Sequence, residues 1–199
     1  MTHLSRKPIK DFLDAVDLVI NSNTFLLHFQ LSSGNIKEEL SSFIRSDDFF
    51  RQITEQDAER RWYNMYNFNY IDDGYTLKPG KLVKKDFDLK FKKKLVGPKE
   101  YLAAMLTANY EIGNFISYYG KQKQPEEAIR IVDDFIFDLT AGKDLVYYII
   151  EPDFLARGGE DRQPDFCEIY YFEGLHASDS ATLLVSEQNA YLLLTNGIP

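Results

Sequence analysis

Cysteine and histidine are scarce in this chain, and their scarcity limits the chemistry that the chain can support. Cys167 is the only cysteine among 199 residues, so an intramolecular disulfide is impossible and a thiolate zinc site lacks its ligands. The three histidines, His3, His28 and His176, share no HxH or HxxxH spacing, and histidine is the usual metal anchor where cysteine is absent. The sequence therefore predicts no metal site, and a reducing compartment.

Long apolar runs and glycine-rich phosphate loops are also missing from the sequence. No stretch approaches the roughly 18 apolar residues that span a bilayer, and Asp11 and Asp14 interrupt the N-terminal segment where a signal peptide needs an apolar region. The single glycine pair, Gly158-Gly159, is followed by Glu160, whose charge would repel a phosphate. We expect a cytoplasmic protein with no membrane contact and no cofactor.

Positive charge is in deficit over the whole chain but is concentrated in one segment. The formal net charge is -8 at pH 7, which argues against a general affinity for nucleic-acid phosphates. Residues 78–99, which we call the lysine segment, nevertheless hold nine lysines against two aspartates, a net charge of +7 that leaves -15 for the rest of the chain.

Two interpretations of the lysine segment are open. Its lysines could track a nucleic-acid backbone, as single-strand binders do, or they could protect an edge strand from aggregation. Phe87, Leu89 and Phe91 alternate with polar residues, so the aromatic side chains and the lysines would point to opposite faces of a strand. Because stacking on bases needs both on one face, this alternation favours the edge strand and makes nucleic acid the less favoured partner.

The first 60 residues have mainly the apolar spacing of helices. Pro8 suits a first helical turn, and the pattern after it predicts a helix over residues 8–21. Asn35 predicts the N-cap of a second helix within residues 35–46. A short turn is expected around Phe49, with a further helix that starts at Thr54. Residues 25–31 form a short apolar run that fits either a buried strand or a helical continuation.

The middle of the chain changes its period and then returns to helices. Residues 66–77 alternate around an Asp-Asp-Gly turn and predict a β-hairpin, and residues 86–92 predict a strand with one wet face. Pro98 opens a long helical pattern that Gly120 closes, and Pro125 opens another that ends near Gly142.

The last third of the chain is richer in strand patterns. Residues 144–151 and 166–173 predict buried strands on either side of a loop. Residues 182–186 and 190–195 predict a closing hairpin, with a helix over 180–194 as the alternative. Helices first, then mixed elements, then antiparallel strands predict an α+β fold with a central β-hairpin and two long helices, packed as a single domain over residues 1–199.

One local cluster has the residue types of a hydrolase. His176 and Ser180 lie close together in the sequence GLHASDS, and Cys167 precedes them on a predicted strand. A nucleophile needs a base within hydrogen-bond reach, but nothing here resembles a G-x-S-x-G elbow. A polar turn is the favoured interpretation, and a hydrolase with an unfamiliar Cys/Ser-His site remains the alternative.

Residues 60–75 combine six aromatic side chains with three asparagines. Part of this stretch must line the core, because soluble proteins rarely tolerate so large an exposed aromatic patch. Tyrosine beside asparagine is, however, also the composition of protein-binding paratopes, and two aspartates at the predicted turn would suit a cationic partner. The residues that we assign to partner binding are Tyr63, Tyr66, Tyr70, Asp72, Asp73 and Tyr75.

These observations predict a soluble acidic protein-binding module that captures a basic partner protein, rather than an enzyme. In size, acidity and lack of catalytic motifs, the chain resembles the immunity proteins and antitoxins that act against basic nuclease toxins. The resemblance covers no specific motif and transfers no residues. It implies an inhibitor that occludes the active site of a basic toxin.

Overall fold

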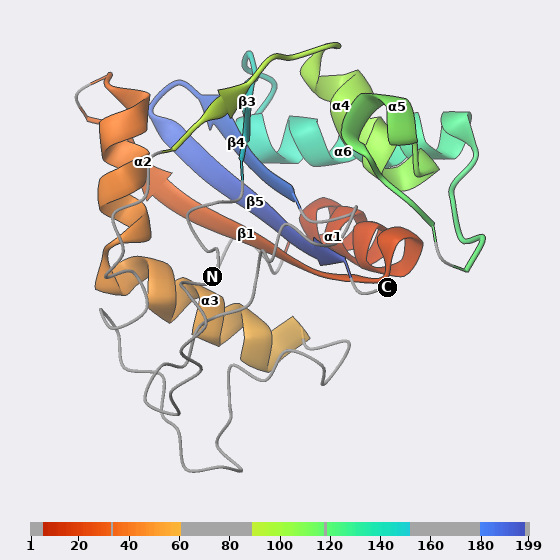
Figure 1. Ribbon diagram of the computed structural model, residues 1–199, viewed down its shortest axis with the longest axis horizontal. Helices are drawn as coiled ribbons and strands as arrows, with labels where there is room; N and C mark the ends of the chain where they lie inside the picture. Colours follow the sequence, from red (N-terminus) through yellow and green to blue (C-terminus); the bar gives the residue numbers. More distant parts are fainter. Residues whose placement is uncertain (1–5, 33, 61–88, 118, 152–179, 198–199) are drawn as a thin grey trace, which may run out of the picture.

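The chain folds as an α+β protein in which helices and one antiparallel sheet pack together as one body (Figure 1). The structure is a computed structural model that describes residues 6–32, 34–60, 89–117, 119–151 and 180–197. The hairpin expected at residues 66–77 and the strand expected at 166–173 lie outside the described residues. The predicted α+β class is confirmed.

Within the described ranges, the helices are α1 (Lys7–Ile20), α2 (Ile36–Ile44), α3 (Asp47–Arg60), α4 (Pro98–Thr107), α5 (Tyr110–Gly113) and α6 (Pro125–Thr140). The strands are β1 (Ser22–Gln30), β2 (Phe91–Lys92), β3 (Val146–Ile150), β4 (Ser180–Ser186) and β5 (Asn189–Gly197). None of the helices in the described part of the chain is long and apolar enough to cross a membrane.

The sheet joins the two ends of the chain. Its strand order is β1-β5-β4-β3-β2, and every neighbouring pair is antiparallel. β4 and β5 form the predicted hairpin around Glu187 and Gln188, and β1 pairs with β5 over its full length, from Ser22↔Gly197 to Gln30↔Asn189. The apolar run at residues 25–31 is therefore part of a strand. This strand, β1, lies at the edge of the sheet and pairs with the apolar strand β5.

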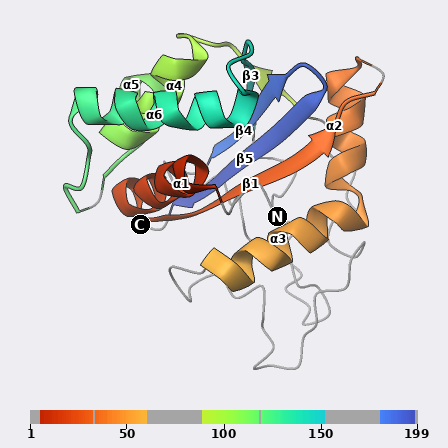
Figure 2. The same cartoon turned by 180° about the vertical axis from the view of Figure 1, so that it is seen from behind.

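Helices cover both faces of this sheet, as the views from front and back show (Figures 1 and 2). Alternate strand residues point to opposite faces, so neighbours such as Leu26 and Leu27 belong to different cores. The first core lies between the sheet and α1, α4 and α6, where Phe12 stacks on Phe135 with ring centroids 4.2 Å apart. The second core lies between the sheet and the helices α2 and α3.

Three predicted helices begin and end close to the expected residues. α1 and α6 each have a proline in the first turn, and α6 ends at Ala141 and Gly142, both with positive φ. The Asn35 side chain accepts a hydrogen bond from the Glu38 amide at the start of α2, as expected of an N-cap. Local capping chemistry therefore fixes these boundaries.

Two expected helix boundaries are wrong. The turn at Phe49 and the helix expected from Thr54 are one continuous helix, α3, because the Ser46 hydroxyl caps the amide of Phe49 and the helix continues through Thr54. Conversely, the long helix expected from Pro98 breaks after α4: Ala108 adopts a left-handed conformation with φ 51°, and Asn109 then caps α5.

The strand expected at residues 86–92 is also shorter than predicted in its described part. β2 has two residues, and it lies at the edge of the sheet, where it pairs with Ile149 and Ile150. Leu89 is buried as the alternation predicts, but Phe91 is 39% exposed. Phe91 lies on β2, the last strand of the sheet in the described part of the chain, so no described strand lies beyond it.

Candidate functional site

The tyrosine-rich surface predicted from the sequence, with Tyr63, Tyr66, Tyr70, Asp72, Asp73 and Tyr75, lies outside the described residues. The same holds for Cys167 and His176 of the alternative hydrolase site. The partner-binding assignment and the hydrolase alternative therefore stay predictions. Three groups of described residues bear on them: Ser180 and its neighbours, the described lysines, and the outer face of α6.

Ser180 lies in a row of hydroxyl groups that crosses three strands. Thr24 of β1 is the register partner of Thr195 of β5, which is in turn the partner of Ser180 of β4. The Ser180 Oγ and Thr195 Oγ1 atoms are 2.7 Å apart, and all three residues are buried on the sheet face that packs against α1, α4 and α6. The strand register brings these residues together although they come from opposite ends of the sequence.

This row continues into a larger buried polar cluster. The Ser22 hydroxyl donates to Asp17 Oδ1 of α1 at 3.3 Å, and it lies 3.0 Å from the Thr24 hydroxyl. Asp17 is only 4% exposed. A buried carboxylate needs hydrogen-bond donors to compensate for its lost hydration, and Ser22 supplies one. Alternating polar positions at the strand ends were a signal for this cluster, but the sequence alone did not reveal which strands pair.

Tyr101 of α4 closes the cluster from the helical side. The Thr182 hydroxyl donates to the Tyr101 hydroxyl at 3.2 Å. Burial of the phenol raises the pKa of Tyr101 to about 12, although the hydrogen bond with Thr182 acts in the opposite direction. Tyr101 is therefore neutral at physiological pH and acts as a hydrogen-bonding group rather than as a base.

The described residues offer Ser180 no nearby histidine. His28 is the histidine that the structure describes, and its row on the sheet includes Tyr191 and Leu184. That row lies four strand residues from Ser180, a distance of about 13 Å. The His28 Nε2 atom is instead 3.2 Å from Asn189 Oδ1. Among described residues, Ser180 is thus held by another hydroxyl and not by a general base.

The described part of the lysine segment lies along the β2 edge. Lys90 pairs with Glu151 at 3.5 Å, and Lys99 pairs with Asp133 at 2.7 Å. The Lys94 Nζ atom lies 5.2 Å from the ring centroids of both Tyr147 and Tyr148. These carboxylates and rings contact three of the five lysines that the structure describes in this segment, and the position beside β2 is that of the predicted edge strand.

The outer face of α6 has a different character. The helix carries five carboxylates and a single arginine, which gives it a net charge of -4. Glu126 and Asp134 are exposed on this face, and in the described part of the chain no cation forms an ion pair with either. Between these carboxylates and the end of the helix, Phe137 is 70% exposed. We call Glu126, Asp134 and Phe137 the α6 acidic face.

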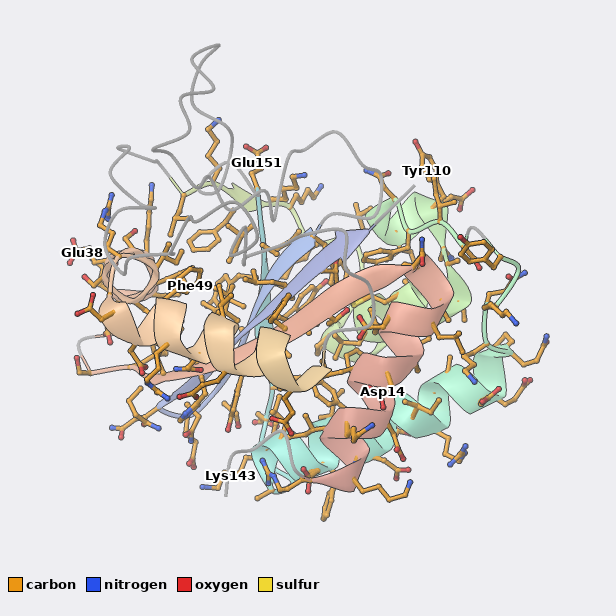
Figure 3. All side chains as sticks on the ribbon, turned by 90° about the horizontal axis from the view of Figure 1, so that it is seen from below. Asp14, Glu38, Phe49, Tyr110, Lys143 and Glu151 are labelled. Carbon is orange, nitrogen blue, oxygen red and sulfur yellow. The ribbon has the colours of Figure 1, made fainter. Side chains whose placement is uncertain are left out.

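The Phe137 ring lies close to the end of its own helix. Gly142 follows α6 with φ 79°, and a Cβ atom at this glycine would lie 3.4 Å from the Phe137 ring. The ring therefore rests against the backbone of the helix terminus, with its other side open to solvent. Figure 3 shows where this end of α6 lies, marked by Lys143.

A metal centre is not formed by the described residues, since no group of three or more histidine, cysteine, aspartate or glutamate side chains converges among them. Comparisons with protein-family models, with curated proteins and with solved structures each gave no match. The geometry of the chain itself is therefore the basis for a functional proposal.

Proposed function

We propose that the chain is a protein-binding module that captures a basic partner protein, and that the α6 acidic face is part of its binding surface. The observation that carries this proposal is an exposed aromatic ring, Phe137, on the same helix face as the carboxylates Glu126 and Asp134. Aromatic anchors surrounded by polar groups dominate the energetics of protein interfaces.

The carboxylates of other helices are less available to a partner. On α1, Asp11 and Asp14 form ion pairs with lysines one turn away. On α3, Arg51 binds both Asp48 and Glu55. Glu126 and Asp134 form no ion pair among the described residues, although Arg130 of the same helix lies four residues from each. Their charge therefore acts on the surroundings of the molecule, where it attracts a cationic protein and speeds encounter.

Phe137 adds a contact that charge alone does not provide. An aromatic face attracts a guanidinium or ammonium group, and the attraction grows when the pair loses water. A partner with arginine or lysine beside an apolar patch would use both the ring and the adjacent carboxylates. This chemistry agrees with the basic partner predicted from the net charge of -8.

The finer form of the proposal is an inhibitor of the immunity or antitoxin type. Such a protein blocks the active site of a basic toxin by steric and electrostatic occlusion, and it needs no catalytic residues. The tyrosine-rich residues Tyr63, Tyr66 and Tyr70 form a second proposed contact region of this inhibitor.

The proposal is tested by affinity capture from lysate of the source cells with three forms of the tagged chain. These are the wild type, the variant Glu126→Lys/Asp134→Lys/Phe137→Ala, and a control variant Glu38→Lys/Asp47→Lys/Tyr110→Ala. Glu38 and Asp47 are exposed like the α6 carboxylates, and Tyr110 is 60% exposed. Both variants change the net charge by the same amount.

We expect the wild type and the control to retain a basic protein in a one-to-one ratio, and the α6 variant to lose it. Equal retention by both variants would remove the α6 acidic face from the binding surface. Equal loss would show that net charge, and not this face, controls capture. An eluate without any stoichiometric basic protein would contradict the binding-module proposal itself.

A further inference from the structure

The outer edge of β1 is covered by two glutamine side chains of α3. Gln56 Oε1 accepts a hydrogen bond from the Leu26 amide at 3.0 Å, and Gln56 Nε2 donates to the Leu26 carbonyl at 2.9 Å. Gln52 does the same at His28, with distances of 2.8 and 2.7 Å. We call Gln52 and Gln56 the glutamine clasp. Each amide thus bonds both backbone groups of one strand residue, as a neighbouring strand would.

The spacing of the helix and of the strand explains why this arrangement fits. The Leu31 amide donates to the Gln188 carbonyl in line with the β1–β5 ladder. The backbone N–H and C=O groups of the odd-numbered residues of β1 therefore point toward β5, and those of Leu26 and His28 point away from the sheet. Two strand residues repeat at about 6.7 Å, and four helix residues rise about 6 Å. Gln52 and Gln56 therefore match His28 and Leu26 in step, with α3 beside β1 in Figures 1 and 3.

Other residues of α3 also hold the two glutamines of the clasp in place. Gln52 Nε2 donates to Asp48 Oδ2 at 2.8 Å as well as to the His28 carbonyl, so both hydrogens of this amide are used. Burial opposes ionisation of Asp48, but hydrogen bonds from Arg51 and Gln52 outweigh it and lower the pKa of Asp48. Phe49 and Ile53 bury the same helix against the second core. The glutamines are therefore fixed in orientation over the strand edge.

The two edges of the sheet are protected in different ways. β2 is two residues long and is flanked by lysines, which discourage pairing with another strand. β1 is nine residues long, SNTFLLHFQ, with no lysine, arginine, aspartate or glutamate. A long uncharged edge offers no repulsion to an identical strand, and two copies can pair antiparallel about a twofold axis. The clasp occupies the backbone groups in the centre of that edge.

We propose that the outer edge of β1 is a strand-docking surface that the glutamine clasp keeps closed, and that its occupant on opening is β1 of a second copy of the chain. The pairing would extend the five-stranded sheet across the twofold axis by backbone hydrogen bonds. This surface is separate from the α6 acidic face, so the proposal goes beyond partner capture and does not depend on it.

The test compares the wild type with the variant Gln52→Leu/Gln56→Leu, which retains helix-forming side chains of similar size but removes both amides. The control is Gln122→Leu/Gln124→Leu. These two glutamines are exposed, and the Gln124 side chain makes no capping bond to α6, so the control adds the same two leucines elsewhere. Sedimentation velocity over a range of protein concentrations gives the mass, and hydrogen exchange gives the protection of the Leu26 and His28 amides.

We expect a monomeric wild type and control, and a clasp variant that dimerises as its concentration rises. The Leu26 and His28 amides of the variant should exchange at least ~tenfold faster than wild type when dilute, and regain protection in the dimer. A clasp variant that stays monomeric at every concentration would overturn the proposal. So would a dimer without protection of these two amides, or a wild type that is already dimeric through β1. If the double variant fails to fold, the single variant Gln52→Leu is measured by the same two criteria.

Discussion

At the scale of single residues, Tyr101 shows how burial controls a side chain without making it reactive. Its ring lies in the first core, against Tyr147 and Phe115, and its hydroxyl bonds with the Thr182 hydroxyl. The folded chain must therefore hold the proton of Tyr101 above the pH at which an exposed tyrosine loses it, and this difference has a measurable consequence for stability.

We expect the wild type to lose stability between pH 10.0, the ordinary pKa of tyrosine, and about 12, the raised pKa of Tyr101. In this window the unfolded chain releases the proton and the folded chain retains it, so the free energy of unfolding falls with pH, by on the order of 2–3 kcal/mol. Below this window both states hold the proton and Tyr101 adds no pH dependence.

Urea unfolding of the wild type and Tyr101→Phe, at about pH 8 and at about pH 11.5, measures this component. Because the variant lacks the hydrogen bond with Thr182, its free energy of unfolding should be about 1 kcal/mol lower than that of the wild type at the lower pH. Between the two pH values, its free energy of unfolding should fall less than that of the wild type. Tyr110→Phe is the control, because Tyr110 is 60% exposed, and it should follow the wild type. Equal declines in wild type and Tyr101→Phe would contradict the role given to burial.

In the tyrosine-rich region, we expect single residues to determine the affinity for the partner protein. Alanine at Tyr66, Tyr70, Asp72 or Asp73 should weaken binding to the captured partner by about tenfold at hot-spot positions, because truncated aromatic and charged anchors typically cost more than 1 kcal/mol. Titration calorimetry with the purified partner gives the affinity of each variant. Unchanged affinity in all four would remove this region from the binding surface, whatever the result for α6.

At the scale of secondary-structure elements, the sequence predicts those helix boundaries that are set by local capping residues and prolines. Pro8, Asn35 and Pro125 mark the starts of helices that form close to where they were expected. The break between α4 and α5 was missed because the apolar spacing continues across it. The signal was Asn109, whose side chain caps two amides of α5, but an asparagine inside a helical pattern is also compatible with an uninterrupted helix.

The buried hydroxyl cluster and the glutamine clasp were not predictable in the same way. Thr24 and Thr195 meet only because β1 pairs with β5, and that pairing joins residues more than a hundred positions apart. Gln56 reads as an ordinary exposed helix residue in the sequence, yet it is 4% exposed. Its role depends on where the edge of the sheet lies, which local periodicity does not encode.

The break after α4 also yields a prediction for stability. Ala108 and Ala141 both adopt left-handed conformations at the ends of α4 and α6, where glycine avoids the strain of a Cβ atom. Ala108→Gly should therefore stabilise the chain by about 0.5–1 kcal/mol. Ala103→Gly, within α4, is the control and should cost about 1 kcal/mol. Thermal or urea unfolding measures both, and destabilisation by Ala108→Gly would contradict the strain argument.

At the scale of the whole molecule, the charge map separates an acidic body from one basic edge. The lysines beside β2 lie at one end of the strand order, and the α6 acidic face belongs to a helix that packs on one face of the sheet. Partner choice by the proposed module would then depend on which side of the molecule a cationic surface meets. Like charges at the β2 edge would repel a partner that approaches there.

We therefore expect association with a basic partner to be steered by charge. The association rate should fall by about tenfold or more between low and high salt, while the dissociation rate changes less, because screening acts mainly on the approach. Surface-immobilised kinetics at several salt concentrations measures both rates. The variant Glu126→Lys/Asp134→Lys should show a weaker salt dependence, and an unaltered one would mean that the rest of the acidic body does the steering.

The pairing of β1 with β5 also sets an order of events during synthesis. β1 emerges from the ribosome early, but about 160 residues separate it from β5, which at 5–20 residues per second is a wait of roughly 10 to 30 seconds. During that time an uncharged, apolar strand would be open to neighbouring nascent chains. α3 follows β1 in the sequence within a few seconds of translation. Its two glutamines would then bond the outer edge of β1 and protect that edge from pairing with another chain until the C-terminal hairpin is synthesised.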